Sequence, residues 1–534
     1  LHKLSGKIHS QHDPREFFMT IIHLIFLFVV IAVLYFSYLL LKNRNYWKNR
    51  NVPFAKPLPL FGNYIEYLLL KKHLSYIADE MCQQFPNEPY FGSFYGTSPA
   101  LIIQDPNLLK LVMSKDFFYC SGKEASDHNH KETISKNLFF AHGDEWKVLR
   151  MNLTPLFSSV KLKNMFYLIK NSSDTLENLL AGEIRTNPNI NVRKLLSRYT
   201  IECITGCAFG LCADTMKKDV QKNPFITMGD ELFDTSDYRA LKNICRSMWP
   251  GLFYSLGFKL FDDNVDTFFN KLISGVFKNR EETKISKNDF VDLILAWKKH
   301  NCITGDSLSN IKTGDKKTIS IEVNEELLIA QCVLFFAAGF ETTSTSTSYL
   351  LFELAKNQIA QDRMIEEVDE YFSKHETIEY ECVTTMPYTE ACIEESLRLY
   401  PVLGILTREV MHDYSLPTGP LMKKGDRIHI PVYHIQRNPK YFPEPEVFRP
   451  ERFFGEEKKN IKPYTYMPFG EGPRTCIGMR FAKMPMHAAL LTIFKNYRVE
   501  LAENMPHKIT FNPKSLIGQP IGGIHIKFIP RIKV

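Results

Sequence analysis

Several familiar sequence signals are missing from this chain of 534 residues. No G-x-G-x-x-G follows a candidate strand, and there is no phosphate-binding P-loop. The net charge is only +7, and no Lys or Arg block of the kind that grips nucleic acid occurs. The eleven cysteines are odd in number and lack framework spacing. The sequence therefore gives no sign of dinucleotide or nucleic-acid binding, and it favours a reducing compartment over a secreted disulfide scaffold.

The composition of the chain is that of a globular protein. Hydrophobic residues make up 44% and charged residues 23%. Apolar residues recur at helical spacing in most segments, as in Leu162–Leu180 and Asp263–Phe277. Short β-type runs occur at three places, Ala100–Gln104, Arg427–Pro431 and Ile524–Ile529. These patterns predict a mainly α fold with a minor β portion.

No second composition shift, internal repeat or long low-complexity tract follows about residue 64. We therefore expect one large domain over residues 64–534. The longest polar stretch, Lys299–Ser320, is predicted to be a surface loop between helices.

The first 63 residues have a different character. Thr20–Leu41 is a run of 22 residues without formal charge, long enough as a helix to cross a bilayer core. It exceeds the apolar part of a signal peptide, and no small-residue cleavage site follows it. Residues 19–41 are therefore predicted to be a transmembrane signal anchor, and residues 1–18 an upstream or non-native segment.

Residues 42–63 are predicted to link this anchor to the body. The segment is basic at its start, so the positive-inside rule places the body on the cytosolic side, at the endoplasmic reticulum membrane. The proline residues that follow fix φ and lack an N–H, so no helix is expected to continue through them. The basic residues are Lys42, Arg44, Lys48 and Arg50, and the prolines are Pro53, Pro57 and Pro59.

One cysteine stands in a distinctive frame. Residues 469–478 read FGEGPRTCIG, which has the form F-x-x-G-x-R-x-C-x-G. Glycines allow close backbone approach, so amide N–H groups can point at the sulfur of Cys476. The helical pattern from Ile477 onward places the sulfur near a helix N-terminus, which favours a thiolate. A cysteine without such a frame is usually a small buried hydrophobic residue, and we expect this of the other ten. The frame around Cys476 instead suits a thiolate ligand of haem iron.

This loop resembles the haem-binding loop of the cytochrome P-450 superfamily. Four further elements stand in that family's order: Trp146–Arg150 as W-x-x-x-R, Ala338–Thr343 as the A/G-G-x-D/E-T motif of the oxygen-activation helix, Glu395–Arg398 as E-x-x-R, and Phe448–Phe453 as F-x-P-E-R-F. The two-position motifs mean little alone, but together with the loop they are specific. The sequences of the proline-rich linker and of the cysteine loop are most similar to those of microsomal insect members of the detoxification type.

The resemblance implies a cofactor, haem b, and residues that hold it. Cys476 would be the iron ligand. Four residues match family positions that contact haem propionates, for which the fork of an Arg is suited: Trp146, Arg150, Arg408 and Arg474. Glu341 and Thr342 stand where oxygen is activated, with the hydroxyl holding a water and the carboxylate relaying protons. The alternative is that the Thr342 hydroxyl merely bonds back to a helix carbonyl.

The resemblance also implies a charged cluster behind the haem. Glu395 and Arg398 lie three residues apart and share a helix face, and Arg452 is expected to join them as a fold-holding group. Gln436 stands where many relatives have the His of His-x-Asp-Pro, which predicts the loss of one polar contact near the haem.

The expected activity is that of a membrane-anchored monooxygenase. Electrons would come from an NADPH-dependent reductase, with cytochrome b5 as a further partner, and Lys147, Arg480 and Lys483 could meet that acidic surface. Two alternatives remain: a haem-thiolate isomerase or dehydratase, and a non-catalytic haem-binding protein. The intact Glu341–Thr342 pair argues against the former.

The substrate is expected to be a lipophilic small molecule, whose identity the sequence does not decide. The resemblance implies a pocket built from four parts of the chain: Tyr119–Asn137, Phe335–Thr342, Leu403–Leu406, and Leu516 with Ile517. These parts are mainly apolar. A further apolar stretch around Pro250 is expected to form an exposed loop that dips into the membrane through Trp249, Leu252 and Phe253.

Overall fold

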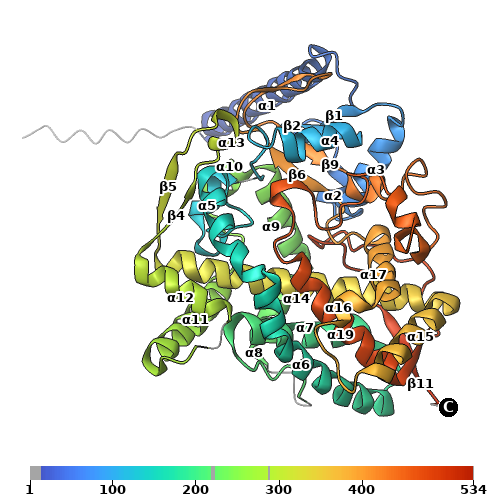
Figure 1. The fold of residues 1–534 in the computed structure, drawn as a ribbon. Helices are drawn as coiled ribbons and strands as arrows, with labels where there is room; N and C mark the ends of the chain where they lie inside the picture. The colour runs from blue at the N-terminus through green and yellow to red at the C-terminus, as the bar shows by residue number, and fades with distance from the viewer. Residues whose placement is uncertain (1–13, 125, 218–222, 287–288, 533–534) are drawn as a thin grey trace, which may run out of the picture.

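Helices dominate the computed structural model, which describes residues 14–124, 126–217, 223–286 and 289–532 (Figure 1). The longer helices are α1 (Pro14–Lys48), α3 (Leu74–Gln84), α5 (Gly143–Leu153), α6 (Ser159–Thr186), α7 (Val192–Phe209), α8 (Pro224–Leu232), α9 (Asp237–Met248), α11 (Asp263–Thr283), α12 (Phe290–His300), α14 (Glu325–Lys356), α15 (Gln358–Lys374), α17 (Pro387–Leu399) and α19 (Met479–Asn496). The short helices are α2 (Ile65–Leu68), α4 (Pro106–Lys110), α10 (Pro250–Ser255), α13 (Asn310–Thr313), α16 (Cys382–Thr385) and α18 (Val432–Ile435).

The strands form small sheets at the edges of the helical body. A four-stranded sheet has the order β1 (Tyr90–Tyr95), β2 (Ser98–Ile103), β9 (Arg427–Ile430) and β6 (Leu406–Glu409), in which β2 and β9 are parallel. A three-stranded sheet has the order β10 (Tyr497–Leu501), β11 (His525–Pro530) and β3 (Asn189–Asn191). Two hairpins pair β4 (Cys302–Asp306) with β5 (Thr318–Glu322), and β7 (Tyr414–Ser415) with β8 (Leu421–Met422). The predicted fold class, mainly α with a minor β portion, is confirmed.

Helix α14 crosses the centre of the molecule (Figure 1). Its sequence is apolar or small on every side, so it is buried almost throughout. The side chain of Asn324 caps its first turn by accepting from the Leu327 N–H. Gly339 allows α7 to approach, because a Cβ there would lie 2.8 Å from Ile204. In the part of the chain that is described, α14 is the one helix long and apolar enough to span a bilayer, but its apolar window is 72% buried in the protein, so α14 is a core helix.

The N-terminal helix has the opposite environment. Several large apolar side chains of α1 are exposed, among them Phe26, Phe28 and Leu34. The apolar stretch Phe26–Tyr38 lies within this helix. The membrane span over residues 19–41 stays a prediction, and residues 1–13 of the expected upstream segment lie outside the described residues.

The segment expected to be a linker is partly built into the body. Helix α1 continues to Lys48, and Trp47 is fully buried, with its indole N–H donating to the Ser93 carbonyl at 3.0 Å. Gly92 makes room for this ring, because a Cβ there would lie 2.5 Å from it. Ala55 donates to the Gly92 carbonyl at 3.0 Å. Residues 47–55 therefore anchor the N-terminal helix to the sheet and do not act as a free spacer.

Two local expectations are wrong. The polar stretch Lys299–Ser320 is not a plain loop, because it contains β4, α13 and the start of β5. The apolar stretch around Pro250 is also not an exposed loop. Pro250 begins α10, Phe253 is buried, and Trp249 packs edge-on against Phe61 at 6.5 Å. Of the three side chains expected at the membrane, the exposed one is Leu252.

Candidate active site

A large cavity opens between α14, α5, β6 and the loop that precedes α19. Its volume is about 320 Å³. Most of its wall is apolar and comes from segments far apart in the chain: Leu138, Phe139, Phe157, Ile204, Phe290, Phe335, Ala338, Leu403, Leu406, Phe469 and Phe481. Its polar groups are few, and they are the groups on which the chemistry of the site depends.

The cysteine loop wraps one wall of the cavity. Cys476 lines this wall, and its backbone N–H donates to the Phe469 carbonyl at 2.8 Å. Gly472 has a φ of +74°, and a Cβ there would lie 1.9 Å from the Met113 carbonyl oxygen, so only glycine fits. The chain then enters α19 through Gly478, its N-cap residue. The loop therefore places the Cys476 sulfur at a helix start, facing the cavity.

Two influences act on the Cys476 thiol in opposite directions. Burial raises the pKa of the Cys476 thiol, whereas the Gly478 N–H and the charge of Arg150 lower it. The helix start alone does not make the sulfur a thiolate in the protein without a bound metal. A metal ion at the sulfur would deprotonate it, because a coordinated thiol loses its proton.

Four cations line the same cavity. Arg474 donates to the carbonyls of Ser121 and Ala141, at 2.8 and 2.6 Å, and its guanidinium lies 4.8 Å from the centre of the Trp146 ring. Arg150 donates to the Thr475 carbonyl at 2.8 Å. The other two cations are Arg408 and Lys123. The predicted group of Trp146, Arg150, Arg408 and Arg474 is thus brought together around one space.

Burial disfavours the charged form of several of these cations. Burial lowers the pKa of Arg408 to about 10, and it lowers the pKa of Arg474 strongly, with Arg408 and Arg150 acting in the same direction. Burial also lowers the pKa of Lys123, with Arg408 and Arg474 assisting and Glu124 opposing. No Asp or Glu is present among the described residues that line the cavity. Uncompensated buried charge is costly, so the site suits an anionic occupant.

The arrangement fits haem. A haem group has an apolar macrocycle, two carboxylates and an iron ion, which match the apolar wall, the cations and the cysteine sulfur. Nε of Arg408 is buried without a hydrogen-bond partner, so one donor on the cavity wall is available to a carboxylate.

The two residues expected to act on oxygen are separated by the structure. Thr342 lines the cavity, and its hydroxyl donates to the Ala338 carbonyl at 2.6 Å. Glu341 points elsewhere. Its Oε1 accepts from Arg193 at 2.7 Å and from Gln519 at 2.6 Å, and the side chain is buried. Burial raises the pKa of Glu341, and Arg193 opposes this effect.

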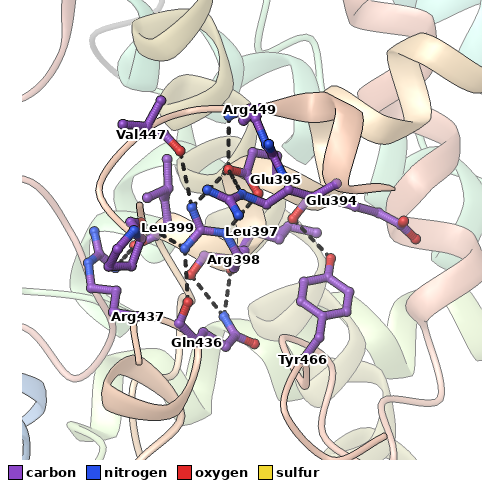
Figure 2. Close-up of polar contacts among 12 residues, drawn as sticks. Glu394, Glu395, Leu397, Arg398, Leu399, Gln436, Arg437, Val447, Arg449 and Tyr466 are labelled. Atoms are coloured by element: carbon purple, nitrogen blue, oxygen red, sulfur yellow. Dashed lines mark hydrogen bonds and ion pairs between the residues drawn. The ribbon is translucent and has the colours of Figure 1, made fainter. Parts of the chain in front are cut away.

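A buried charge network surrounds Glu395 and Arg398 (Figure 2). The fully buried Arg398 donates to both carboxylate oxygens of Glu395, at 2.7 and 2.8 Å. Its other donors reach the carbonyls of Gln436 and Pro445, at 2.9 and 2.8 Å. Arg452 lies 3.4 Å from the same carboxylate. This cluster matches the expected fold-holding group.

Gln436 does not lose polar contacts as expected. It is fully buried, and its amide donates to the carbonyls of Leu397 and Arg398, at 3.1 and 3.0 Å. Its Oε1 accepts from the Met467 N–H at 2.8 Å. Gln436 therefore joins α17 to the segment that leads into the cysteine loop.

The expected pocket residues and surface cations agree with the structure only in part. The cavity is lined by Phe335, Leu403 and Leu406 as expected, but Leu516 is 61% exposed and lies outside the lining. Lys483 is not a free surface charge, because it pairs with Glu390 and Glu394. Lys123 lines the cavity from the expected segment Tyr119–Asn137, but no motif marked it as a cation of the site. A lone Lys gives no local signal for such a role, nor does Gln519, which reaches Glu341 across 178 positions.

The fold and this site define a class: a mainly helical protein with a cysteine loop that presents sulfur to a cavity rimmed by cations. The family profile of cytochrome P-450 matches residues 52–528. The chain is 34% identical to cytochrome P-450 6B2 of Helicoverpa armigera over 94% of its length and 97% of that protein. It is 35% identical to cytochrome P-450 6B1 of Papilio polyxenes, over 96% of this chain and 100% of that protein. It is 30% identical to cytochrome P-450 6a2 of Drosophila melanogaster, over 94% of this chain and 99% of that protein.

The chain belongs to the cytochrome P-450 family. It is a haem-thiolate monooxygenase, similar to insect enzymes throughout its catalytic body. The resemblance stated from the five motifs is confirmed.

Proposed function

We propose that this enzyme holds haem b with Cys476 as the iron ligand and oxidises lipophilic small molecules. The haem carboxylates would be bound by Arg150, Arg408 and Arg474, with the Trp146 ring stacked beside the guanidinium of Arg474. The observation that carries this proposal is the cavity itself, which gathers Cys476, Thr342 and the cations without a lining carboxylate. Thiolate-bound haem supplies activation of O2 and transfer of one oxygen atom to the substrate.

The protein contributes orientation and charge at one side of the cavity. Arg474 is held on two carbonyls and on the Trp146 ring, so its remaining N–H groups are fixed in direction. Arg150 is tied to the carbonyl of Thr475, the residue before the ligand. These contacts couple the position of the carboxylate-binding cations to that of the cysteine sulfur.

Thr342 would control the proton supply inside the cavity. Its hydroxyl proton is committed to the Ala338 carbonyl, so its oxygen accepts hydrogen bonds from water in the cavity. The back-bond is thus compatible with the expected role. Glu341 would act from outside the cavity by holding α7 and the segment around Gln519 to α14, and it would reach the cavity only after leaving Arg193.

We also infer the cellular setting. An anchor over residues 19–41 would hold the body at the cytosolic face of the endoplasmic reticulum membrane. Electrons would come from an NADPH–haemoprotein reductase, with cytochrome b5 as a second donor, because the sequence contains no dinucleotide motif. The apolar cavity wall supports lipophilic substrates, either xenobiotics or endogenous lipids and hormones.

The test is a turnover assay with purified enzyme, added reductase and a panel of apolar compounds. We expect NADPH consumption that depends on both reductase and substrate, with an oxygenated product. An isomerase or dehydratase would convert a peroxide without NADPH, and a haem-binding protein would convert nothing. Either result would refute the proposal.

A further inference from the structure

The hairpin made by β4, α13 and β5 lies along α5 (Figure 1). Alternate residues of β4 face inward, where Ile303 is 4% exposed and joins the main hydrophobic core, whereas Thr304 and Asp306 face outward. Leu308, just beyond the strand, is also buried in that core. The hairpin is therefore packed on the body and is not a loose surface insertion.

Hydrogen bonds fasten this hairpin near both ends of α5. At the start of the helix, Oδ1 of Asp144 accepts from the Ser307 hydroxyl at 2.9 Å and from the Leu308 N–H at 2.6 Å. At the end, the amide of Asn152 donates to the Thr304 carbonyl at 2.9 Å. Two attachments on one helix prevent it from sliding or rotating relative to the hairpin.

Between these attachments the two elements are in close contact. A Cβ at Gly305 would lie 3.3 Å from both Sδ of Met151 and Cα of Val148. Any larger residue at position 305 would push the hairpin away from the helix. The opposite side of α5 carries Trp146 and Arg150, which line the cavity.

The tip of the hairpin contacts Phe118 and Tyr119. The Lys312 ammonium lies 4.6 Å from the centre of the Tyr119 ring and 5.7 Å from that of Phe118. The same segment touches the site, because the Phe117 ring lies 5.1 Å from Trp146 and the Ser121 carbonyl accepts from Arg474. The hairpin thus contacts both segments that support the carboxylate-binding cations.

We propose that residues 302–322 form a positioning strap that holds α5 and residues 117–121 in place and thereby sets how tightly the enzyme retains haem. The strap touches neither substrate nor cofactor, and it acts through Trp146, Arg150 and Arg474. This inference rests on the proposed haem site. Asp144 is its main positioning residue, because one carboxylate oxygen makes both bonds at the hairpin turn.

The experiment measures haem release from the loaded enzyme to a haem-free globin. Asp144→Ala and Gly305→Val should each speed release by about 5- to 30-fold, because contacts between the hairpin and α5 are lost. Asp144→Asn keeps an acceptor oxygen and should release haem at nearly the parent rate. Asp306→Ala removes an acid from the outer face of the same strand and should also leave release unchanged.

Amide hydrogen exchange of the same variants separates positioning from general damage. We expect faster exchange in α5 and residues 117–121 of Asp144→Ala, with the remainder of the body unchanged. Unchanged haem release in Asp144→Ala and Gly305→Val would overturn the strap, and so would faster exchange spread over the whole chain. Each sample is first checked for a thiolate-ligated CO spectrum, so that a failure of the proposed haem site is seen before the strap is judged.

Discussion

Two groups of buried arginines have opposite surroundings. Arg398 is fully enclosed, and its guanidinium donates to Glu395 and to backbone carbonyls. Arg408 is equally enclosed, yet its Nε makes no hydrogen bond, and no carboxylate among the described residues lines its cavity. The first group is complete in the sense that Glu395 supplies its carboxylate, whereas the second group is incomplete, because no described residue that lines the cavity supplies one.

This contrast separates charges that hold the fold from charges that, in the proposed function, bind the haem carboxylates. Arg398 and Arg408 are both arginines and both buried, so neither burial nor residue type distinguishes them. The two groups are distinguished by the presence or absence of a protein carboxylate beside the arginine. A paired buried charge is expensive to break, whereas an unpaired one is expensive to keep without its ligand.

The largest effect is expected from breaking the complete group. Glu395→Ala would leave Arg398 and Arg452 buried without their carboxylate, at a cost of about 3–5 kcal/mol. That is a large part of the roughly 5–15 kcal/mol that stabilises a typical protein, so little folded enzyme should be recovered. Denaturant unfolding and soluble yield measure the loss. The control is Glu370→Ala, in an exposed pair with Lys374, where a change below about 1 kcal/mol is expected; equal losses in both variants would contradict the contrast.

The next effect concerns an acid placed beside the cavity cations. Burial opposes ionisation of Glu124, but Arg427 and His429 outweigh it and lower the pKa to about 2 from 4.5. Because the folded-state pKa is lower, ionised Glu124 contributes about 3 kcal/mol above pH 4.5. That contribution is lost as the pH falls from about 4.5 to 2.

The Glu124→Gln variant tests this contribution. Its free energy of unfolding should be lower than that of the parent at pH 6 and should fall less steeply on acidification. Denaturant midpoints measured between pH 6 and pH 3 provide the comparison. Parallel pH profiles for parent and variant would show that Glu124 is not a paired charge.

A smaller and selective effect is expected from the incomplete group. Arg408→Met removes a cation that the protein does not balance, so the variant should fold and be recovered in near-parent yield. Its haem should leave about 10- to 100-fold faster, since a hydrogen bond to a charged group contributes about 1.5–3 kcal/mol. Arg480→Met, at the surface, serves as the control. Parent-like haem retention in Arg408→Met would refute the assignment.

The smallest structural effect is expected at Thr342. Its hydroxyl donates back to its own helix, so Thr342→Ala should keep stability, haem and substrate binding. The variant should nevertheless consume more NADPH per molecule of product, with the excess forming peroxide or water. The reason is that the cavity loses the Thr342 hydroxyl, which accepts a hydrogen bond from water. Thr347→Ala removes a similar back-bond, to Thr343, from a buried position and should stay coupled. Unchanged coupling in Thr342→Ala would make this residue purely structural.

The sequence was most informative where a physical requirement is local. The motif Ala338–Thr343 predicted a helix, which is α14, and the glycines around Cys476 predicted a tight loop that the Gly472 geometry requires. The W-x-x-x-R motif and the cysteine loop also predicted Arg150 and Arg474, which line the cavity.

Non-local contacts were beyond the sequence. The carboxylate of Glu341 is held by Arg193 and Gln519, which lie 148 and 178 positions away, so its orientation away from the cavity had no local signal. Pro250 was interpreted as a helix breaker, but proline is also favoured in the first turn of a helix, and α10 begins there. The hairpin within the polar stretch was missed because the alternation in Thr318–Glu322 covers only five residues.

The absorption spectrum of the reduced, CO-bound enzyme tests the central claim most directly. If Cys476 supplies a thiolate to haem in this cavity, the parent should show the long-wavelength band that defines the superfamily. Cys476→Ala should lose that band. A Cys476→Ala variant that binds haem with an unchanged spectrum would contradict the assignment of the iron ligand and, with it, the account of the cavity.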